Sequence, residues 1–175
     1  MSKEALSDKN NERIFRNDAG EQLSLRDVVL RIRDKIALDR LATHEIVVGS
    51  DSQAAESGSA AFVTAIVVRK VGNGAIYFWT RNNQEFHGLR DRIWKEAFLS
   101  IMLAQEIRST VREVIGDEVF WEDRLEVRCI HLDMGLNGPT KSFIDSIAGM
   151  VRGFGFVPVI KPYSYGASVV ADRHT

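Results

Sequence analysis

Three features are scarce in this chain: cysteine, long apolar runs and net charge. Cys129 has no second cysteine with which to form an intramolecular disulfide, and it lies in an apolar, strand-like run, so we expect a buried, inert thiol. No apolar run approaches the roughly 18 residues that a membrane-spanning helix needs, and residues 1–20 lack the apolar core of a signal peptide. These absences predict a water-soluble protein of the cytoplasm.

Net charge and histidine spacing each argue against one class of ligand. The formal net charge is −1, so nothing global attracts the chain to nucleic acid, although a local basic patch is compatible with a neutral total. No two of the four histidines have a metal-ligand spacing such as H-x-x-x-H, which argues against a zinc site. His174, close to Asp172, is either an aid to proton transfer or a solvated side chain near the end of the chain.

The composition is that of an ordinary globular domain. Of the 175 residues, 45% are hydrophobic and 27% are charged, which suits one domain with its own core. Residues 1–20 are polar and aperiodic, so we predict a flexible tail there. We predict an N-terminal helical extension over residues 21–43 and the main domain over residues 44–175.

The helical extension begins at a recognisable signal. Ser24 and Asp27 resemble a capping box, and apolar residues recur at helical spacing from Leu25 as far as Leu41. The main domain then reads as three strands joined by short turns, followed by helix, strand, helix, strand and helix. These elements are expected at 44–52, 60–70, 75–82, about 89–111, 125–133, within 135–155, at 156–162 and at 167–175.

This order of elements predicts a mixed sheet. Strands linked by tight turns pair antiparallel, as Gly72-Asn73-Gly74 indicates for one hairpin, whereas strands joined through a helix lie parallel. The expected fold class is therefore α/β, with a five-stranded sheet of three antiparallel and then two parallel strands, flanked by helices. That is the ribonuclease H-like arrangement.

Two aspartates lie at strand ends. Asp51 ends the first strand, and Asp133 ends the fourth, just before Gly135. Alternation puts Val47 and Gly49 on the face of Asp51, and a glycine there leaves room for a ligand or another backbone. A turn residue at the strand exit is the plain structural alternative. Because ligands bind outside the carboxyl ends of parallel strands, and these two strands are neighbours in the predicted sheet, we expect both carboxylates close together.

Two further acids lie on helices. Glu96 falls between the two apolar stripes of its helix, near the sheet-facing side, where a glutamate needs a cation. Ion pairs with the nearby Arg92 or Lys95 on a solvated face are the alternative. Asp172 follows three apolar residues in the last helix, where a carboxylate on a frayed final turn would ordinarily have no role.

The segment from Gly135 to Ser142 is similar to the phosphate-cradling pattern G-x-x-x-x-G-K-[ST], since it follows a strand and opens a helix. It departs from that pattern at Thr140, which stands where a glycine is required before Lys141, and Pro139 removes a backbone donor. We therefore interpret it as a helix start, whose N-terminus could still hold a substrate phosphate.

Four blocks of sequence resemble a known family. They are GSDSQ at 49–53, RIWKEA at 92–97, HLDMGLNGPTK at 131–141 and KPYSYGASVVADRHT at 161–175. On these blocks, residues 44–175 resemble the YkuK-like family, bacterial proteins that are ribonuclease H-like and of unassigned function. The resemblance implies a fold in which an acid on the first strand, the first core helix, the fourth strand and the last helix together hold two divalent metals. The matching residues are Asp51, Glu96, Asp133 and Asp172.

This match predicts a two-metal-dependent nuclease, a hydrolase that cleaves phosphodiester bonds in RNA, DNA or a hybrid, with nucleic acid as its partner. Hard cations prefer carboxylate oxygens, so Mg²⁺ or Mn²⁺ is the expected cofactor, with two ions about 3.5–4 Å apart. Lys141, Lys161 and Arg173 are the expected phosphate contacts, because each adjoins a proposed catalytic segment.

Two alternatives stand beside the nuclease. The first is a catalytically silent ribonuclease H-like module that binds nucleic acid or acts as a scaffold. The chain has a helix before the minimal fold and lacks a strongly basic protrusion for substrate binding, so the way in which it would bind a substrate is open. The second is a nucleotide-dependent phosphotransferase, because actin-like ATPases share the core sheet. The short chain lacks the second lobe that such enzymes need.

Overall fold

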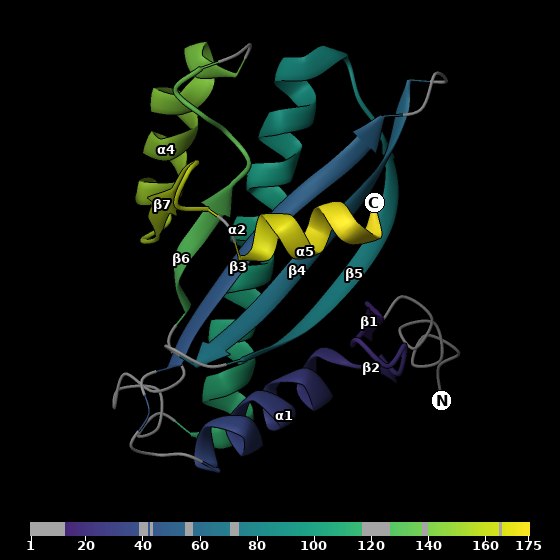
Figure 1. Ribbon diagram of the computed structural model, residues 1–175, viewed down its shortest axis with the longest axis vertical. Coiled ribbons are helices and arrows are strands. Elements are labelled where there is room, and N and C mark those ends of the chain that lie inside the picture. Colours follow the sequence, from purple (N-terminus) through teal and green to yellow (C-terminus); the bar gives the residue numbers. More distant parts are fainter. Residues whose placement is uncertain are drawn as a thin grey trace, which may run out of the picture.

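The described part of the chain forms one mixed sheet with helices on both faces in the computed structural model (Figure 1). The residues described are 13–38, 42, 44–54, 58–70, 74–116, 127–137, 140–164 and 166–175. The strands are β1 (Phe15–Arg16), β2 (Gln22–Leu23), β3 (His44–Ala54), β4 (Ser59–Lys70), β5 (Ala75–Glu85), β6 (Val127–Leu132) and β7 (Val157–Val159). The helices are α1 (Leu25–Ala37), α2 (Gly88–Ile115), the 3₁₀ turn η3 (Lys141–Phe143), α4 (Ile144–Gly153) and α5 (Ala167–His174).

Strand pairing confirms the predicted mixed sheet. Within the described residues the strand order is β2-β1-β5-β4-β3-β6-β7. The long strands β3, β4 and β5 pair antiparallel, and β6 and β7 add to β3 in parallel. The predicted hairpin is β4 and β5, in which Arg69 pairs with Ala75. The residues of its Gly-Asn-Gly turn before Gly74 lie outside the described residues.

The expected number of strands was wrong, because the described sheet has seven strands rather than five. The two additional strands, β1 and β2, pair with each other and extend the sheet beyond β5, where Arg16 pairs with Trp79. Phe15 lies within the segment predicted as a flexible tail, yet its side chain is fully buried, as Leu23 nearly is. Strands of two residues are too short to show an alternating pattern, so their burial was not visible in the sequence.

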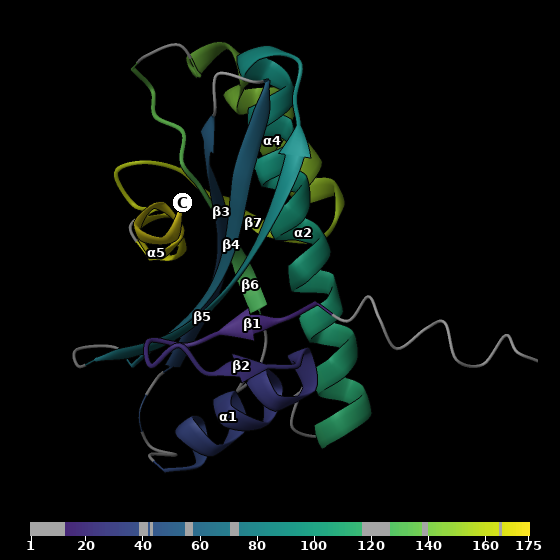
Figure 2. The ribbon, with the colours of Figure 1, turned by 90° about the vertical axis from the view of Figure 1, so that its right-hand side faces the viewer.

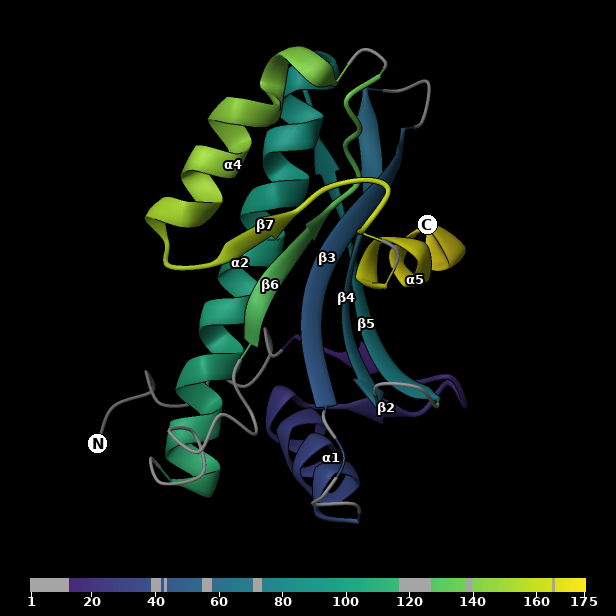
Figure 3. The ribbon, with the colours of Figure 1, turned by 60° about the vertical axis from the view of Figure 1, so that its left-hand side comes forward.

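The helix α1 begins as predicted, at a capping box. The Ser24 side chain accepts a hydrogen bond from the Asp27 backbone N–H, and the Asp27 carboxylate accepts one from the Ser24 N–H. The buried face of α1 joins the main core beside α2 through residues that include Val28, Val29 and Ile32. In the figures α1 lies at the end of the sheet opposite α4 (Figure 3).

Helices cover the two faces of the sheet unequally. Figure 2 shows α2 and α4 together on one face and α5 alone on the other. The larger core lies on the α2 side, whereas α5 packs through Ala167 and Ala171 on a smaller cluster that includes Val47. A Cβ on Gly49 would lie 2.8 Å from the His131 carbonyl oxygen and 3.0 Å from the Ala167 Cβ. The absence of a side chain at Gly49 therefore lets the His131 backbone and the first residue of α5 pack closely against β3.

Two smaller observations complete the fold. Cys129 is half-buried, and burial raises the pKa of its thiol. In the part of the chain that is described, no helix has both the length and the apolar character needed to cross a bilayer.

Candidate active site

The parallel register of β3 and β6 brings two acids to one level. Gly49 pairs with His131 and Ser50 with Leu132, so the next position along each strand carries Asp51 and Asp133. Asp51 does not end its strand as predicted, because β3 continues to Ala54, whereas Asp133 directly follows β6. Both still lie toward the carboxyl ends of neighbouring parallel strands, the usual place for ligands in such a sheet. The negative charge of Asp133 acts on Asp51 and raises its pKa, which agrees with their proximity.

Asp51 is a half-buried carboxylate with a strongly shifted pKa. Burial, the largest cause, and the charges of Asp133 and Asp172 raise the pKa of Asp51 to about 6, against the opposing effect of a hydrogen bond from the Ser52 backbone. The effect of Asp172 on the pKa of Asp51 shows that α5, although distant in sequence, brings negative charge near the end of β3. Asp172 itself is exposed on the last turn of α5.

Glu96 reaches the same end of β3 from α2. The Ser52 hydroxyl donates a 2.5 Å hydrogen bond to Glu96 Oε1, and the Arg92 guanidinium donates to the Ser52 carbonyl oxygen at 2.8 Å. Burial, with the charges of Asp51 and Asp133, raises the pKa of Glu96 to about 7. Asp51 and Glu96 thus both have a pKa that burial raises toward neutral, a condition that is frequent at functional sites.

Lys161 is the cation that the structure places among these acids. Its ammonium Nζ lies 2.6 Å from Asp133 Oδ1, with the Lys161 and Asp133 side chains 56% and 31% exposed. This hydrogen bond, together with the charges of Asp133, Asp51 and Asp172, raises the pKa of Lys161. The loop after β7 is held on the strand-end side by a backbone hydrogen bond from Lys161 N to Met134 O of 2.8 Å.

The other two expected phosphate contacts, Lys141 and Arg173, are exposed basic residues. Lys141 is exposed at the first position of η3, and Arg173 is exposed beside Asp172. Neither forms an ion pair with the four acids in the described part of the chain. Thr140 precedes η3 as its N-cap residue, and Gly138 and Pro139 of the phosphate-loop-like segment lie outside the described residues.

Sequence reasoning missed two residues of the site. The Ser52 hydroxyl orients Glu96, and Arg92 holds the Ser52 backbone through its carbonyl oxygen, but the sequence alone assigns neither role. The signal was present: alternation places Ser52 on the face opposite Asp51, and Arg92 stands one helical turn before Glu96.

The four acids do not form a ready metal cage. Among the described residues, no three His, Cys, Asp or Glu side chains converge closely enough to hold a metal ion. The Asp133 carboxylate is turned to Lys161, and Asp51 and Glu96 approach the end of β3 from opposite faces. The acids are close enough for their charges to raise the pKa values of Asp51 and Glu96, but in the described residues their oxygens do not converge on a single point where a metal ion could lie.

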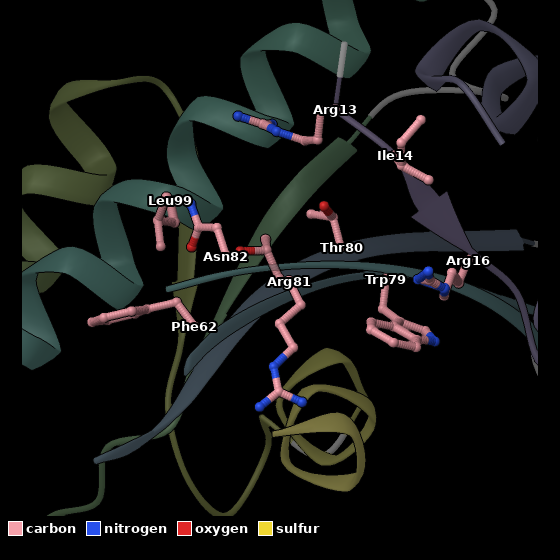
Figure 4. A pocket seen from close by; sticks show the side chains of 10 residues that line it. Arg13, Ile14, Arg16, Phe62, Trp79, Thr80, Arg81, Asn82 and Leu99 are labelled. Atoms are coloured by element: carbon pink, nitrogen blue, oxygen red, sulfur yellow. The ribbon is translucent and has the colours of Figure 1, made fainter. Parts of the chain in front are cut away.

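A pocket of about 570 Å³ lies away from these acids, between β5, the segment before β1 and α2 (Figure 4). The segment before β1 leads into the single pair Arg16–Trp79, through which β1 joins β5. An ion pair of 2.7 Å between Arg13 and Glu106 ties this segment to α2. In Figure 4 Arg81 extends toward α5, away from Arg13. No carboxylate of the described residues lines this pocket, so it does not share the acid chemistry at the strand ends.

Comparison with known proteins agrees with this geometry. Residues 27–175, from inside α1 to the end of the chain, match the family model described as "Ribonuclease H-like". The chain is 29% identical over 168 residues to the uncharacterized protein YkuK of Bacillus subtilis, covering 93% of this chain and 96% of that protein. No solved structure gives a significant match. The family match, the YkuK relative and the mixed sheet together confirm the predicted resemblance: the chain belongs to the ribonuclease H-like family, among its YkuK-like members.

Proposed function

We propose that this protein is a divalent-metal-dependent nuclease that hydrolyses phosphodiester bonds, with Asp51, Glu96, Asp133 and Asp172 as metal-binding and catalytic residues. The observation that carries the proposal is the mutual effect of carboxylates from four separate elements at the carboxyl ends of β3 and β6. Acids held near one another against their repulsion need a compensating cation. The family match supports the fold on which this chemistry would operate.

The donor set fits a hard cation in its chemistry. All four groups are carboxylates, whose oxygens Mg²⁺ and Mn²⁺ prefer, and the histidines contribute no cluster in the described residues that would favour zinc. The arrangement fits after a local change, in which Asp133 turns from Lys161 toward Asp51. Side-chain rotation at two groups that are each partly exposed requires no movement of the strands.

In the proposed mechanism the residues of the chain bind, orient and move protons. Asp51 and Glu96 would hold the cation in their ionised form, and its charge would offset the burial and the mutual repulsion that raise both pKa values. Bound Mg²⁺ or Mn²⁺ would lower the pKa of an attacking water and stabilise the leaving oxygen. Ser52 keeps Glu96 in place through its hydroxyl. Lys161, once Asp133 no longer holds it, would contact the phosphate that is cleaved. Lys141 and Arg173 would contact other phosphates of the nucleic-acid chain.

A second candidate is favoured by one specific observation. Lys161 neutralises Asp133, and the described residues contain no ready three-ligand cluster. A ribonuclease H-like module that binds nucleic acid without cleaving it would be built in this way, with a lysine ammonium in place of a metal ion.

A cleavage and melting experiment separates the two. The full chain is incubated with labelled single-stranded, duplex and hybrid substrates in Mn²⁺, beside Asp51→Asn, and its melting temperature is measured with and without Mg²⁺ or Mn²⁺. The nuclease predicts cleavage that Asp51→Asn abolishes, together with stabilisation of the wild type of about 2.7 kcal/mol when the metal is at a hundred times its Kd. Binding without cleavage, and melting that metal does not change, would support the silent module instead.

A further inference from the structure

A second pocket opens directly beside the acids. Its volume is about 480 Å³, within the range of about 300–1,000 Å³ that is typical of ligand sites. It lies between the loop that follows β7 and the helix α5. The lining residues are Asp133, Lys161, Pro162, Ser164, Ser168, Val169 and Asp172. Because Asp133, Lys161 and Asp172 belong to the candidate active site, anything bound here lies next to it.

Ser164 gives this pocket an unused polar group. The residue is only 2% exposed, and its hydroxyl oxygen is buried without a hydrogen-bond partner in the described part of the chain. The neighbouring Ser168 hydroxyl does not serve it, because that hydroxyl donates to the Ser164 backbone carbonyl oxygen. Buried polar groups in folded proteins nearly always have a partner, and Ser164 lines the pocket, so rotation of its hydroxyl toward the pocket would let a ligand complete the bond.

The remaining walls are apolar. Pro162 and Val169 line the pocket, and the Val169 side chain is 52% exposed. Tyr163, between two lining residues, is 73% exposed, which is unusual for a large aromatic side chain. The pocket therefore combines a charged end at Lys161 and the acids, one hidden hydroxyl and apolar surface beside an exposed ring.

We infer that this pocket holds the sugar and base of one unpaired nucleotide, whose phosphate lies at the acids, so that the substrate is single-stranded nucleic acid. This inference rests on the proposed function. A base in a duplex is stacked and paired, so it cannot enter a pocket walled by a loop and a helix, whereas the bases of a single strand turn out and pack on apolar and aromatic side chains. The Ser164 hydroxyl then pairs with a sugar hydroxyl or a base edge, and Lys161 neutralises the phosphate.

The test compares single-stranded and duplex oligonucleotides of the same sequence. Fluorescence anisotropy measures their Kd for the full-length chain in Ca²⁺, with Ser164→Ala, Val169→Asp and the control Val157→Asp, an exposed valine on β7 away from the pocket. We expect the wild type to bind the single strand at least about tenfold more tightly than the duplex. Ser164→Ala should weaken single-strand binding about fivefold, the value of one hydrogen bond, and Val169→Asp about tenfold through repulsion of the strand. Val157→Asp should bind as the wild type does.

Stability provides an independent readout. Ser164→Ala removes an unpaired buried hydroxyl, so the variant should melt at the wild-type temperature or above while it binds the single strand less well. Equal binding of duplex and single strand, or wild-type single-strand affinity in Val169→Asp, would overturn the inference. These outcomes are separate from those for the proposed function: cleavage of duplex in Mn²⁺ that Val169→Asp leaves unchanged would keep the nuclease and reject the pocket. Variant-sensitive single-strand binding without any cleavage would keep the pocket and reject the nuclease.

Discussion

The Ser52 hydroxyl donates a hydrogen bond of 2.5 Å to Glu96 Oε1 across the space between β3 and α2. Because alternate residues of a strand point to opposite faces, Ser52 meets α2 while Asp51 points to the side on which α5 lies. One short stretch of β3 thus carries one acid and orients another that arrives from a helix. The adjacent β6 supplies Asp133 at the same level.

Replacement of Ser52 by alanine should shift the titration of Glu96. The hydrogen bond from Ser52 lowers the pKa of Glu96 against the larger effect of burial, so its loss raises that pKa beyond its value of about 7. We expect a rise of about one unit, measured by carbon-13 NMR of the side-chain carboxyl, and the same displacement of the pH profile of Mn²⁺-dependent cleavage. Ser52→Thr keeps the hydroxyl and should titrate as the wild type does. A Glu96 titration that Ser52→Ala leaves unmoved would show that the bond has no electrostatic effect.

Glu96→Gln should stabilise the metal-free protein at high pH. Burial raises the pKa of Glu96 from 4.5 to about 7, so its protonated form is favoured in the folded state. The stability that this group contributes is fully present below pH 4.5 and is lost as the pH rises through about 7. Glutamine cannot ionise and still accepts from Ser52, so urea unfolding in a chelator should show similar stability at pH 5 and a gain of about 1–3 kcal/mol at pH 8.

A matched control for this measurement lies on the same helix. Glu106 makes a surface ion pair with Arg13, with both side chains 37% exposed. Glu106→Gln should change the stability by less than about 1 kcal/mol and should show no gain between pH 5 and pH 8. If both variants gain equally at pH 8, the effect belongs to the net charge of the protein and not to the site.

Lys161→Met should tighten metal binding and slow cleavage. Lys161 neutralises Asp133 at 2.6 Å, so a metal must compete with an ammonium for that carboxylate. Methionine keeps the length of the side chain without the charge, and we expect Mn²⁺ affinity by calorimetry to rise about tenfold, the size of a charge-assisted hydrogen bond. The cleavage rate should fall, because a phosphate contact is lost. Lys95→Met, which breaks an ion pair of 2.7 Å with Asp91, is the control and should bind metal as the wild type does. Weaker metal binding in Lys161→Met would mean that Lys161 holds the site together.

Sequence reasoning found the acids but not their surroundings. The positions of Asp51 and Asp133 toward the carboxyl ends of parallel strands were predictable from alternation and chain order, although β3 continues beyond Asp51 to Ala54. The ion pair between Lys161 and Asp133 was not, since it depends on how the loop after β7 returns to β6 through the bond to Met134. Similarly, Phe15 gave no signal of a strand, because two residues cannot show a period. Local periodicity specifies elements, whereas contacts between distant loops are set only by packing.

The aromatic stack at the end of α5 should control how well Asp172 serves a metal site. The His174 ring lies on the Trp79 ring of β5, with centroids 4.4 Å apart and planes 11° apart, one half-turn beyond Asp172. A stack of this kind is worth about 0.5–1.5 kcal/mol, and it fixes a last turn that would otherwise fray. His174→Ala should therefore weaken Mn²⁺ binding by about threefold to tenfold in calorimetry, and deletion of residues 172–175 should weaken it at least as much. His174→Phe keeps the stack without an imidazole and should retain the wild-type affinity, which would assign the residue to positioning. Equal losses in His174→Phe and His174→Ala would assign the effect to the imidazole and revive the proton-transfer role, whereas unchanged affinity after the deletion would exclude Asp172 from the site.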